Sequence, residues 1–313
     1  MASSAEPGER VAWFRGEIRP EREVLISFRD GAAVHADGVY DTERTFRGRI
    51  FRLDQHLDRL WRSMAYVGIQ PPIARAELAE ITLEVARRNY EICGRDIWVT
   101  QRVSTGTPRE YGGDATPTLI VESLPLPFES RAPFFRDGIV VVTPALRRVP
   151  PWALSPQAKT VNYLNPLLAG RQAAATTPGA WPILLDEHGN LSEGGGANVF
   201  AVRDGALMTP RAEYVLPGIT REVVLELAAG LGIPADERDI GLFEATTADE
   251  MFVTATSLCV CPIVTFNGTR MRSGAIPGPV TRRLQEAFSD LVGVDIVAQY
   301  LERLSGDARP PFV

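Results

Sequence analysis

A proline-rich stretch, LPLPFESRAPF, separates two parts of the chain that each carry regular strand and helix patterns. A stretch of this kind without a hydrophobic period is typical of the connection between two folding units. The chain has 313 residues, more than a single hydrophobic core usually organises. We therefore predict a small N-terminal domain over 1–123, a linker over 124–135 and a larger C-terminal domain over 136–313.

The N-terminal part mixes strand and helix patterns. Short β-type runs extend from Val24 to Phe51, among them GVYDTERTF and a hairpin turn in FRGRIF. The segment RLDQHLDRLWRSMAYVGI carries apolar residues at three- and four-residue spacing, which predicts a helix that Asp54 could cap. A second helix is expected at ARAELAEITLEVARRNY, and strands at DIWVTQRVS and PTLIVESLPL. This part should be an α+β domain.

The C-terminal part alternates strand and helix patterns, which predicts an α/β domain. Strands are expected at GIVVVTPA, WPILLDEHGN, ANVFAVRDGALMTP and EMFVTATSLCVCPIV. Helices are expected at VNYLNPLLAGRQAAA, TREVVLELAAGLG and PGPVTRRLQEAFSDLV. The fold class of the whole chain is therefore α/β.

Charge and cysteine content narrow the classes of partner. The net charge of -6 and the pI near 5.3 leave no broad basic surface for nucleic acid or an anionic membrane. The start of the sequence lacks the apolar core of a signal peptide, and no apolar run is long enough to span a membrane. Three cysteines suit neither a disulfide framework nor a metal site. We expect a cytoplasmic protein that acts on small molecules without a bound metal.

Lys159 is the only lysine among 33 basic residues. Arginine keeps its proton in water, whereas a partly buried lysine can serve as nucleophile or base. A chain that keeps one lysine therefore indicates a position that needs an amine. The alternative is a surface lysine in an arginine-rich protein.

Four further features have both a functional and an ordinary explanation. In LSEGGGANVF, Glu193 precedes three glycines, and such an acid is commonly a solvated residue of a turn. LPGITREVV opens a helix whose free N–H groups could bind an anion. The hydroxyls of VTATS could donate to phosphate or belong to a plain strand, and Arg59 could lie on a solvated helix face. Together with Lys159 these are the groups needed to hold pyridoxal 5′-phosphate: an amine for a Schiff base, an acid for the pyridine nitrogen and donors for the phosphate.

Five segments resemble, in their sequences and in their order along the chain, those of the class IV, fold-type IV pyridoxal-phosphate aminotransferases. The segments are HADGVYDTERTFRGRIFRLDQHLDRL, RRVPPWALSPQAKTVNYLN, LLDEHGNLSEGGGANVFAV, LPGITREVV and TADEMFVTATS. The resemblance implies the two-domain fold of D-amino-acid aminotransferases and a homodimer with shared active sites. It also implies a ping-pong reaction between an amine or amino acid and a keto acid.

The resemblance assigns cofactor roles to individual positions. Lys159 would form the Schiff base and move the proton, and Glu193 would face the pyridinium. Tyr163 would donate to the phenolic oxygen of the cofactor, and Asn198 would border the ring. The phosphate would be bound by Arg59, Ile219, Thr220 and Thr256.

The substrate is less closely defined by the same segments. HADGVYD and RRVPPWALSP are most similar to (R)-amine transaminases, while Tyr40 also suits D-amino-acid transaminases. Arg109 is the candidate for a mobile arginine that binds the keto acid carboxylate, with a solvated loop residue as the alternative. The remaining residues expected at the substrate site are His35, Arg44, Arg102 and Ser257. A branched-chain L-amino-acid aminotransferase, an aminodeoxychorismate-lyase-like enzyme and a non-catalytic cofactor-binding relative are the alternatives.

Overall fold

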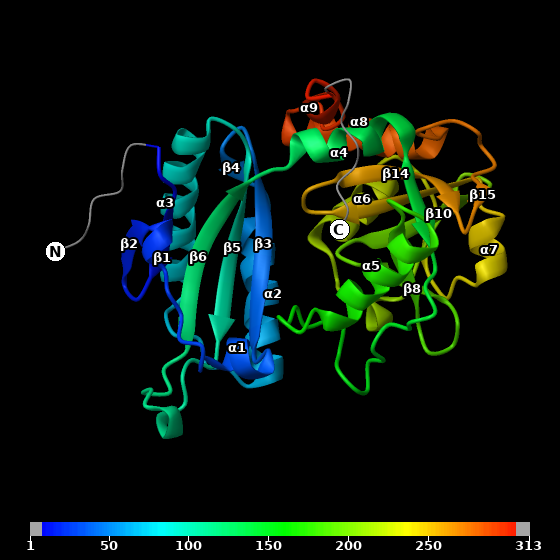
Figure 1. Ribbon diagram of the computed structural model, residues 1–313. Coiled ribbons are helices and arrows are strands. Elements are labelled where there is room, and N and C mark those ends of the chain that lie inside the picture. Colours follow the sequence, from blue (N-terminus) through cyan, green and yellow to red (C-terminus); the bar gives the residue numbers. More distant parts are fainter. Residues whose placement is uncertain (1–7, 305–313) are drawn as a thin grey trace. The chain divides into compact units, whose positions relative to one another are not determined.

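The computed structural model describes residues 8–304 and divides into two compact units (Figure 1). The first unit comprises Met1–Leu126 together with Ala158–Asn162, and the second comprises Pro127–Gln157 and Tyr163–Val313. The short segment Ala158–Asn162 therefore belongs to the first unit, although it lies between two stretches of the second in the sequence. That segment contains Lys159.

The first unit is an antiparallel sheet with its core on one face. Its strand order is β2-β1-β6-β5-β3-β4. Leu57 and Leu60 from the first long helix and Val85 from the second pack with Val39 and Val99 of the sheet. The elements are β1 (Val11–Phe14), β2 (Glu17–Pro20), α1 (Gly31–His35), β3 (Gly38–Phe46), β4 (Arg49–Ile50), α2 (Leu53–Val67), α3 (Arg75–Cys93), β5 (Ile97–Ser104) and β6 (Thr118–Pro125).

Two local predictions for this unit are wrong. No strand forms between Val24 and Val34, where irregular chain leads into the short helix α1. Asp54 lies within the first turn of α2 and is not its N-cap, because the helix begins after Arg52, whose φ is 57°. The strand β3, the helices α2 and α3 and the strands β5 and β6 form where the sequence predicts them.

The second unit is built around a ring of strands. The order β10-β13-β14-β7-β8-β9 closes on itself because β9 also pairs with β10. Three of the strand pairs are parallel, β7 with β8, β14 with β7 and β11 with β12, so the sheet is mixed. The strands are β7 (Ile139–Val142), β8 (Trp181–Leu185), β9 (Leu191–Gly194), β10 (Asn198–Arg203), β11 (Ala206–Thr209), β12 (Ala235–Glu237), β13 (Glu250–Ala255), β14 (Cys259–Phe266) and β15 (Thr269–Arg270).

Helices of the second unit cover this ring, as Figure 1 shows for α5, α6 and α8. They are α4 (Phe128–Asp137), α5 (Leu164–Thr176), α6 (Ile219–Gly230), α7 (Leu242–Thr246), α8 (Pro279–Val292) and α9 (Ala298–Leu301). The residues 124–135, which we expect to link two domains, contain the end of β6 and most of α4. In the part of the chain that the structure describes, no helix combines the length and apolar character needed to cross a membrane.

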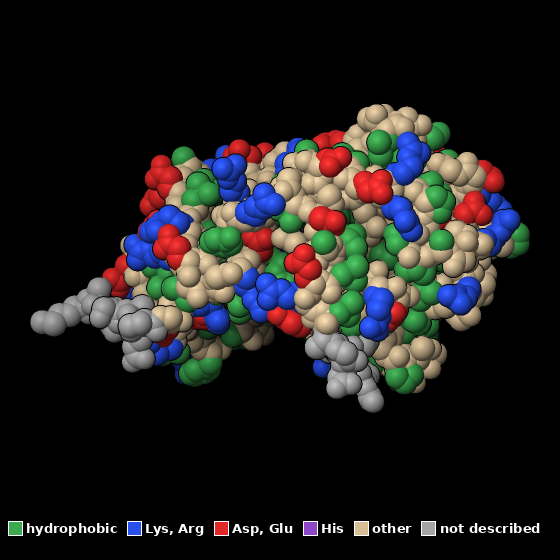
Figure 2. All heavy atoms as spheres, turned by 90° about the horizontal axis from the view of Figure 1, so that it is seen from above, with side chains coloured by type: hydrophobic (Ala, Val, Ile, Leu, Met, Phe, Trp, Pro, Cys, Tyr) green, Lys and Arg blue, Asp and Glu red, His purple; other side chains and the backbone are tan. Residues whose placement is uncertain are grey.

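Charged side chains of both signs are interspersed on the face drawn in Figure 2. Basic and acidic groups alternate over short distances on each unit, and several form exposed ion pairs, such as Arg87 with Glu91 and Arg211 with Asp239. Such pairs contribute little to stability because water screens them.

Candidate functional site

The backbone around Lys159 extends the edge of the first unit's sheet. The Tyr40 N–H donates to the Lys159 carbonyl at 3.0 Å, and the Val161 N–H donates to the Gly38 carbonyl at 3.0 Å. The Lys159 N–H in turn donates to Oγ of Ser63 on α2 at 3.0 Å. Three hydrogen bonds thus fix the main chain on both sides of the lysine, and its side chain starts from a rigid position.

Tyr40 lies beside the lysine amine. The Lys159 Nζ is 4.6 Å from the centroid of the Tyr40 ring, a distance at which the aromatic face attracts a cation. Arg102 is the cross-strand neighbour of Tyr40, and its guanidinium carbon lies 5.6 Å from the same ring. Arg102 also pairs with Glu122 at 3.0 Å. Three residues predicted from the sequence are therefore neighbours on one face of the sheet.

Arg44 lies on the same strand as Tyr40, four residues further along. It is 2 % exposed, and its guanidinium carbon is 4.0 Å from the Phe46 ring centroid. Alternate residues of a strand share a face, so Tyr40 and Arg44 point to the same side of β3. His35 and Arg109, in contrast, are exposed residues of the short helix α1 and of a 3-10 turn over Arg109–Tyr111.

The other face of β3 carries a buried charged group. Asp41 accepts from Arg59 at two positions, Nε to Oδ2 at 2.9 Å and Nη2 to Oδ1 at 2.7 Å, and His56 Nδ1 lies 2.7 Å from Oδ1. Burial alone would oppose ionisation, but Arg59 and His56 hold the pKa of Asp41 well below its usual range. Arg59 is 3 % exposed, so the alternative of a solvated helix arginine is wrong.

Glu43 lies two residues after Asp41 and faces the same side. Burial, followed by the charge of Asp41, raises the pKa of Glu43 well above its usual range. Gln101 Nε2 donates to Glu43, while Oε2 of Glu43 and Oε1 of Gln101 have no hydrogen-bond partner among residues 8–304. Asp41, Glu43 and His56 have the donor atoms of a metal site and lie within 4.8 Å of one another. The Arg59 guanidinium on Asp41 supplies the positive charge there, which opposes a second cation.

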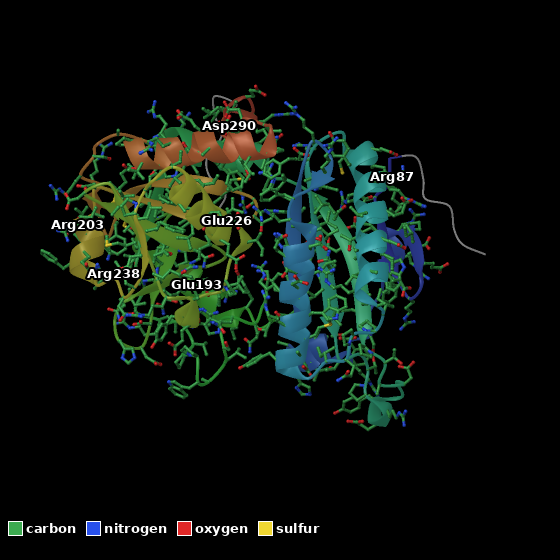
Figure 3. All side chains as sticks on the ribbon, turned by 180° about the vertical axis from the view of Figure 1, so that it is seen from behind. Arg87, Glu193, Arg203, Glu226, Arg238 and Asp290 are labelled. Atoms are coloured by element: carbon green, nitrogen blue, oxygen red, sulfur yellow. The ribbon has the colours of Figure 1, made fainter. Side chains whose placement is uncertain are left out.

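Glu193 lies inside the second unit (Figure 3), at a tight turn between β9 and β10. It pairs across the two strands with Asn198, and the Gly194 N–H closes the turn by donating to the Ala197 carbonyl at 2.7 Å. Glu193 is a residue of β9 next to the turn, and it is buried, with 7 % of its surface exposed. The prediction of a turn is confirmed, and the alternative of a solvated acid is wrong.

Each oxygen of Glu193 has a donor. Arg148 Nε donates to Oε1 at 2.9 Å, and the Leu216 N–H donates to Oε2 at 3.0 Å. The Asn198 amide donates to the Leu216 carbonyl at 2.9 Å, so Leu216 is held through both of its backbone polar groups. Leu216 lies two residues before Gly218, the N-cap of α6. The acid and the start of this helix are thereby linked.

Tyr163 and α6 border the same turn. The Tyr163 hydroxyl donates to the Gly195 carbonyl, and a Cβ on Gly196 would lie only 3.0 Å from that hydroxyl. Gly218, the N-cap of α6, has no side chain to cap the first turn, where Ile219 and Thr220 are 4 % and 8 % exposed. The N–H groups of that turn and the Thr220 hydroxyl have the chemistry to bind an anion.

The turn between β13 and β14 carries Thr256 and the buried Ser257. Arg131 of α4 donates to the Ser257 hydroxyl, and Tyr300 of α9 donates from its hydroxyl to the Ser257 carbonyl. The Tyr300 ring stacks on Phe135 with 4.2 Å between centroids. Two helices far apart in the sequence therefore hold this turn.

Sequence reasoning missed Arg148, Arg131, Asp41 and Tyr300 as parts of these networks. Arg148 lies within RRVPPWALSP, and Asp41 within GVYDTERTF. The signal for Asp41 is an acid at an inward-facing position of a strand, two residues after the buried Val39. Arg131 and Tyr300 carry no such pattern, because only tertiary packing brings them to Ser257.

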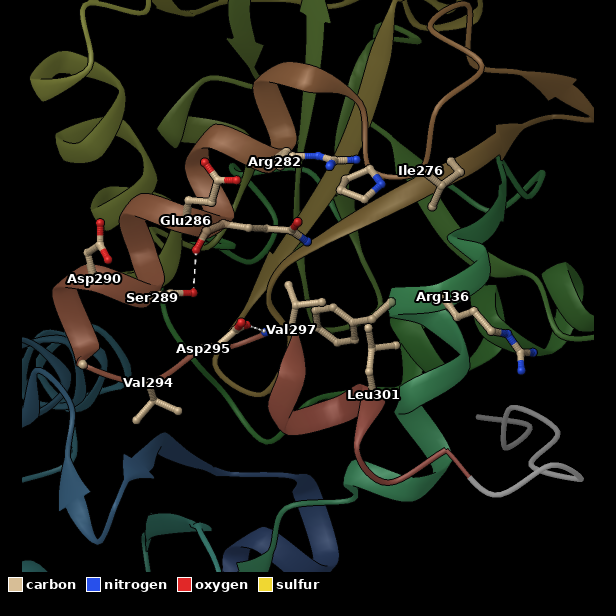
Figure 4. Close-up of a pocket in the computed structure, with 14 residues that line it drawn as sticks. Arg136, Ile276, Arg282, Glu286, Ser289, Asp290, Val294, Asp295, Val297 and Leu301 are labelled. Atoms are coloured by element: carbon tan, nitrogen blue, oxygen red, sulfur yellow. Dashed lines mark hydrogen bonds between the residues drawn. The ribbon is translucent and has the colours of Figure 1, made fainter.

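A separate pocket of about 840 Å³ lies among α4, α8 and α9 (Figure 4). None of the predicted site residues lines it. Its polar groups serve the local fold: Ser289 donates to the Gln285 carbonyl at 2.7 Å, and Asp295 accepts from the Val297 N–H at 2.9 Å at the start of α9. Because these polar groups bond within the local fold, they do not indicate a ligand for the pocket.

Residues 38–266 match the protein family described as amino-transferase class IV. The chain is 34% identical over 288 residues to a putative branched-chain-amino-acid aminotransferase of Methanocaldococcus jannaschii, covering 89% of this chain and 95% of the relative. It is 29% identical over 283 residues to a D-alanine aminotransferase of Bacillus licheniformis, covering 89% and 96%.

A solved structure extends the likeness to the fold. A T.th. branched-chain amino acid aminotransferase, complexed with N-(5'-phosphopyridoxyl)-L-glutamate, superposes with a TM-score of 0.80 at 26% sequence identity. The superposition covers 92% of this chain and 96% of that one. The predicted fold type is confirmed by this likeness.

Proposed function

The chain belongs to the class IV aminotransferase family, and we propose that it transfers an amino group from an amine or amino acid to a keto acid, with pyridoxal 5′-phosphate as its cofactor. The observation that carries this proposal is the fixed main chain of Lys159, the only lysine, whose amine lies 4.6 Å from the Tyr40 ring. The T.th. relative is complexed with a phosphopyridoxyl compound, which supports the same cofactor here.

The residues present fit this cofactor. An amine is present at Lys159 and a buried guanidinium at Arg59. A buried carboxylate is present at Glu193, a hydroxyl at Tyr163 and N–H and hydroxyl donors at the start of α6 with Thr220. These are the donor types that a protonated pyridine ring and a phosphate dianion require.

When bound, pyridoxal 5′-phosphate supplies an electron-accepting ring. Lys159 would attach it through Nζ and, once displaced by the amino donor, would take the proton from the α-carbon of that donor. Glu193 would accept a hydrogen bond from the pyridine nitrogen, and Asn198 would border the ring. Arg59, Ile219, Thr220 and Thr256 would donate to the phosphate.

For the substrate we infer a preference for (R)-amine or D-amino-acid donors in a ping-pong reaction with a keto acid. Tyr40, Arg44 and Arg102 support this preference, because β3 and its neighbour place them on the side of the sheet where the lysine amine lies. Arg109 is exposed and would reach the keto acid carboxylate by movement of its loop, while His35 and Ser257 would complete the substrate site.

A branched-chain L-amino-acid aminotransferase is the second candidate. The relatives from Methanocaldococcus jannaschii and T.th. favour it by name. A lyase of the aminodeoxychorismate type would use the same cofactor residues. As in the family resemblance, we expect a homodimer in which loops of one subunit close the active site of the other.

The purified protein tests the cofactor proposal directly. It should bind pyridoxal 5′-phosphate with a visible absorption band that survives gel filtration, and Lys159→Ala should lose that band. Lys159→Arg is the matched control for charge, because arginine keeps the positive charge but cannot act as the attaching amine. A protein that shows no spectral change with added cofactor would contradict the proposal.

A donor panel tests the substrate. Pyruvate or 2-oxoglutarate is offered with (R)-1-phenylethylamine, its (S) enantiomer, D-alanine or L-leucine. Activity with the (R)-amine or D-alanine supports the preferred assignment, and activity with L-leucine alone supports the branched-chain candidate. Release of pyruvate from aminodeoxychorismate in the absence of a keto acid acceptor would instead indicate a lyase.

A further inference from the structure

A buried triad of Asp41, His56 and Arg59 joins β3 to α2 in the first unit. All three side chains are at most 3 % exposed. His56 and Arg59 lie three residues apart on α2, so they point to the same side of the helix, toward Asp41 on β3. The triad therefore connects two elements that also contribute Val39, Leu57 and Leu60 to the hydrophobic core.

The proton positions in the triad follow from the charge of Asp41. A carboxylate with a depressed pKa only accepts hydrogen bonds. The proton of the 2.7 Å bond must then be on His56 Nδ1, which donates to Asp41 Oδ1. Burial lowers the pKa of His56, which favours the neutral ring, and Arg59 is the cation that balances Asp41.

The two bonds between Arg59 and Asp41 fix the plane of the guanidinium. They use Nε and Nη2, and a carboxylate bound in this two-point manner leaves little freedom of rotation. The main chain of Arg59 is tied to the lysine segment as well: Ser63 Oγ donates to the Arg59 carbonyl at 2.9 Å and accepts from the Lys159 N–H. Arg59 is thus held at both ends.

We propose that Asp41 and His56 are positioning residues that hold the Arg59 guanidinium in the orientation in which it binds the phosphate of the cofactor. This inference rests on the proposed function of Arg59 as a phosphate-binding residue. Asp41 and His56 do not themselves touch the cofactor. Asp41 fixes the guanidinium by its two bonds, and His56 holds the carboxylate of Asp41 by one bond.

A triad that only stabilised the fold would affect ligand binding differently from a triad that orients Arg59. If the triad only stabilised the first unit, its loss would weaken every ligand of the site to the same extent. If it orients Arg59, its loss must weaken a ligand that carries a phosphate and spare one that lacks it. Pyridoxal 5′-phosphate and pyridoxal are such a pair, because they differ in the phosphate alone.

The experiment compares the dissociation constants of the two ligands for the cofactor-free protein by absorbance or fluorescence titration. We expect Asp41→Asn to raise the dissociation constant of pyridoxal 5′-phosphate about 10- to 100-fold, which is the effect of losing one charge-assisted hydrogen bond. The dissociation constant of pyridoxal should change by less than about twofold. His56→Phe should have the same selectivity with a smaller loss. The double variant Arg59→Gln with Asp41→Asn should bind pyridoxal 5′-phosphate no more weakly than Arg59→Gln alone, since both substitutions act on the same contact with the phosphate.

Asp58→Asn is the matched control, because Asp58 lies on the same helix and pairs with an arginine, Arg75, in an exposed position. It should change neither dissociation constant.

Two outcomes would overturn the inference but leave the proposed function intact. In the first, Asp41→Asn weakens the binding of both ligands equally. In the second, Asp41→Asn weakens neither, although Arg59→Gln removes the preference for the phosphate-bearing ligand. If Asp41→Asn does not fold in a circular dichroism melt, His56→Phe decides. An Arg59→Gln protein that retains the phosphate preference would instead refute the assigned role of Arg59.

Discussion

Glu193 and Asn198 face each other across the β9–β10 turn and hold opposite ends of the same residue, Leu216. The Glu193 carboxylate accepts from the Leu216 N–H at 3.0 Å, and the Asn198 amide donates to the Leu216 carbonyl at 2.9 Å. Because α6 begins three residues later, this pair sets where the start of the helix lies relative to the acid. Glu193, the proposed partner of the pyridine ring, and the start of α6, the proposed phosphate site, are therefore held in fixed relative positions through Leu216.

We predict that Asn198→Ala will weaken this link. The substitution removes a partly buried hydrogen bond and leaves the Leu216 carbonyl without its Asn198 donor, which should lower the free energy of unfolding by about 1–3 kcal/mol. It should also weaken binding of pyridoxal 5′-phosphate, as measured by titration of the cofactor-free protein. Asn165→Ala is the control, since Asn165 makes the same type of bond to the Arg147 carbonyl in an exposed position. Identical behaviour of the two variants would contradict the special role of Asn198.

Gly218→Ala should conflict with the same asparagine. A Cβ at Gly218 would collide with Oδ1 of Asn198. We expect a loss of about 1–3 kcal/mol in the unfolding free energy, measured by urea denaturation. In a protein that already carries Asn198→Ala, the additional loss caused by Gly218→Ala should be much smaller, because the colliding atom is then absent. If the two losses are instead additive, the contact between these side chains is not the cause.

Much of this arrangement could be predicted from the sequence. The periodicity of RLDQHLDRLWRSMAYVGI is that of α2, and the alternation in GVYDTERTF is that of β3. The motif LSEGGGANVF predicts a turn, which the structure has between β9 and β10. The single lysine in the sequence indicates a position that needs an amine, and the family match supports the same cofactor chemistry.

Other features could not be predicted, for physical reasons. The burial of Glu193 depends on Arg148 and Leu216, which approach it from distant parts of the chain, whereas local spacing describes only the turn itself. The segment Val24–Val34 has apolar residues of β type, yet it forms no strand, because strand formation needs a partner with free backbone groups and local propensity does not supply one. The proline-rich stretch tolerates the helix α4, with Pro133 inside it.

Arg148 offers a test of how Glu193 is tuned. We predict that Arg148→Gln will lower the rate of the half-reaction with an amino donor about tenfold or more, since a hydrogen bond to a charged group contributes about 1.5–3 kcal/mol. The bound cofactor should also shift its absorption band, because the carboxylate proposed to face the ring loses its Arg148 donor. Stopped-flow absorbance measures both effects.

Arg147→Gln is the control for this prediction. Arg147 precedes Arg148 in the sequence, carries the same charge and is exposed. It should leave the rate and the band unchanged. A change of the same size in both variants would mean that overall charge, and not the contact with Glu193, is responsible.

Glu43 should make the stability of the protein depend on pH. Burial raises the pKa of Glu43 well above its usual range, so the folded protein binds this proton more tightly than the unfolded chain does. The unfolding free energy must then fall as pH rises from the usual glutamate pKa, near 4.3, toward the raised value. Glu43→Gln removes this fall and can pair with Gln101 as the protonated acid does, because a glutamine amide and a carboxylic acid each have a donor group and an acceptor group.

We therefore expect Glu43→Gln to be more stable than the natural protein by roughly 1–3 kcal/mol at pH 8, and close to it at pH 4, in urea unfolding at both pH values. Glu84→Gln is the control of opposite sign, because Arg87 and Arg88 lower the pKa of Glu84 to about 2 on an exposed helix face. That substitution should lower stability slightly at pH 8 and have less effect at pH 4, since water screens exposed pairs. A Glu43→Gln variant that is less stable than the natural protein at pH 8 would contradict this prediction. It would show that Glu43 stabilises the fold as a carboxylate, with the positive charge of Arg59 stabilising both Asp41 and Glu43.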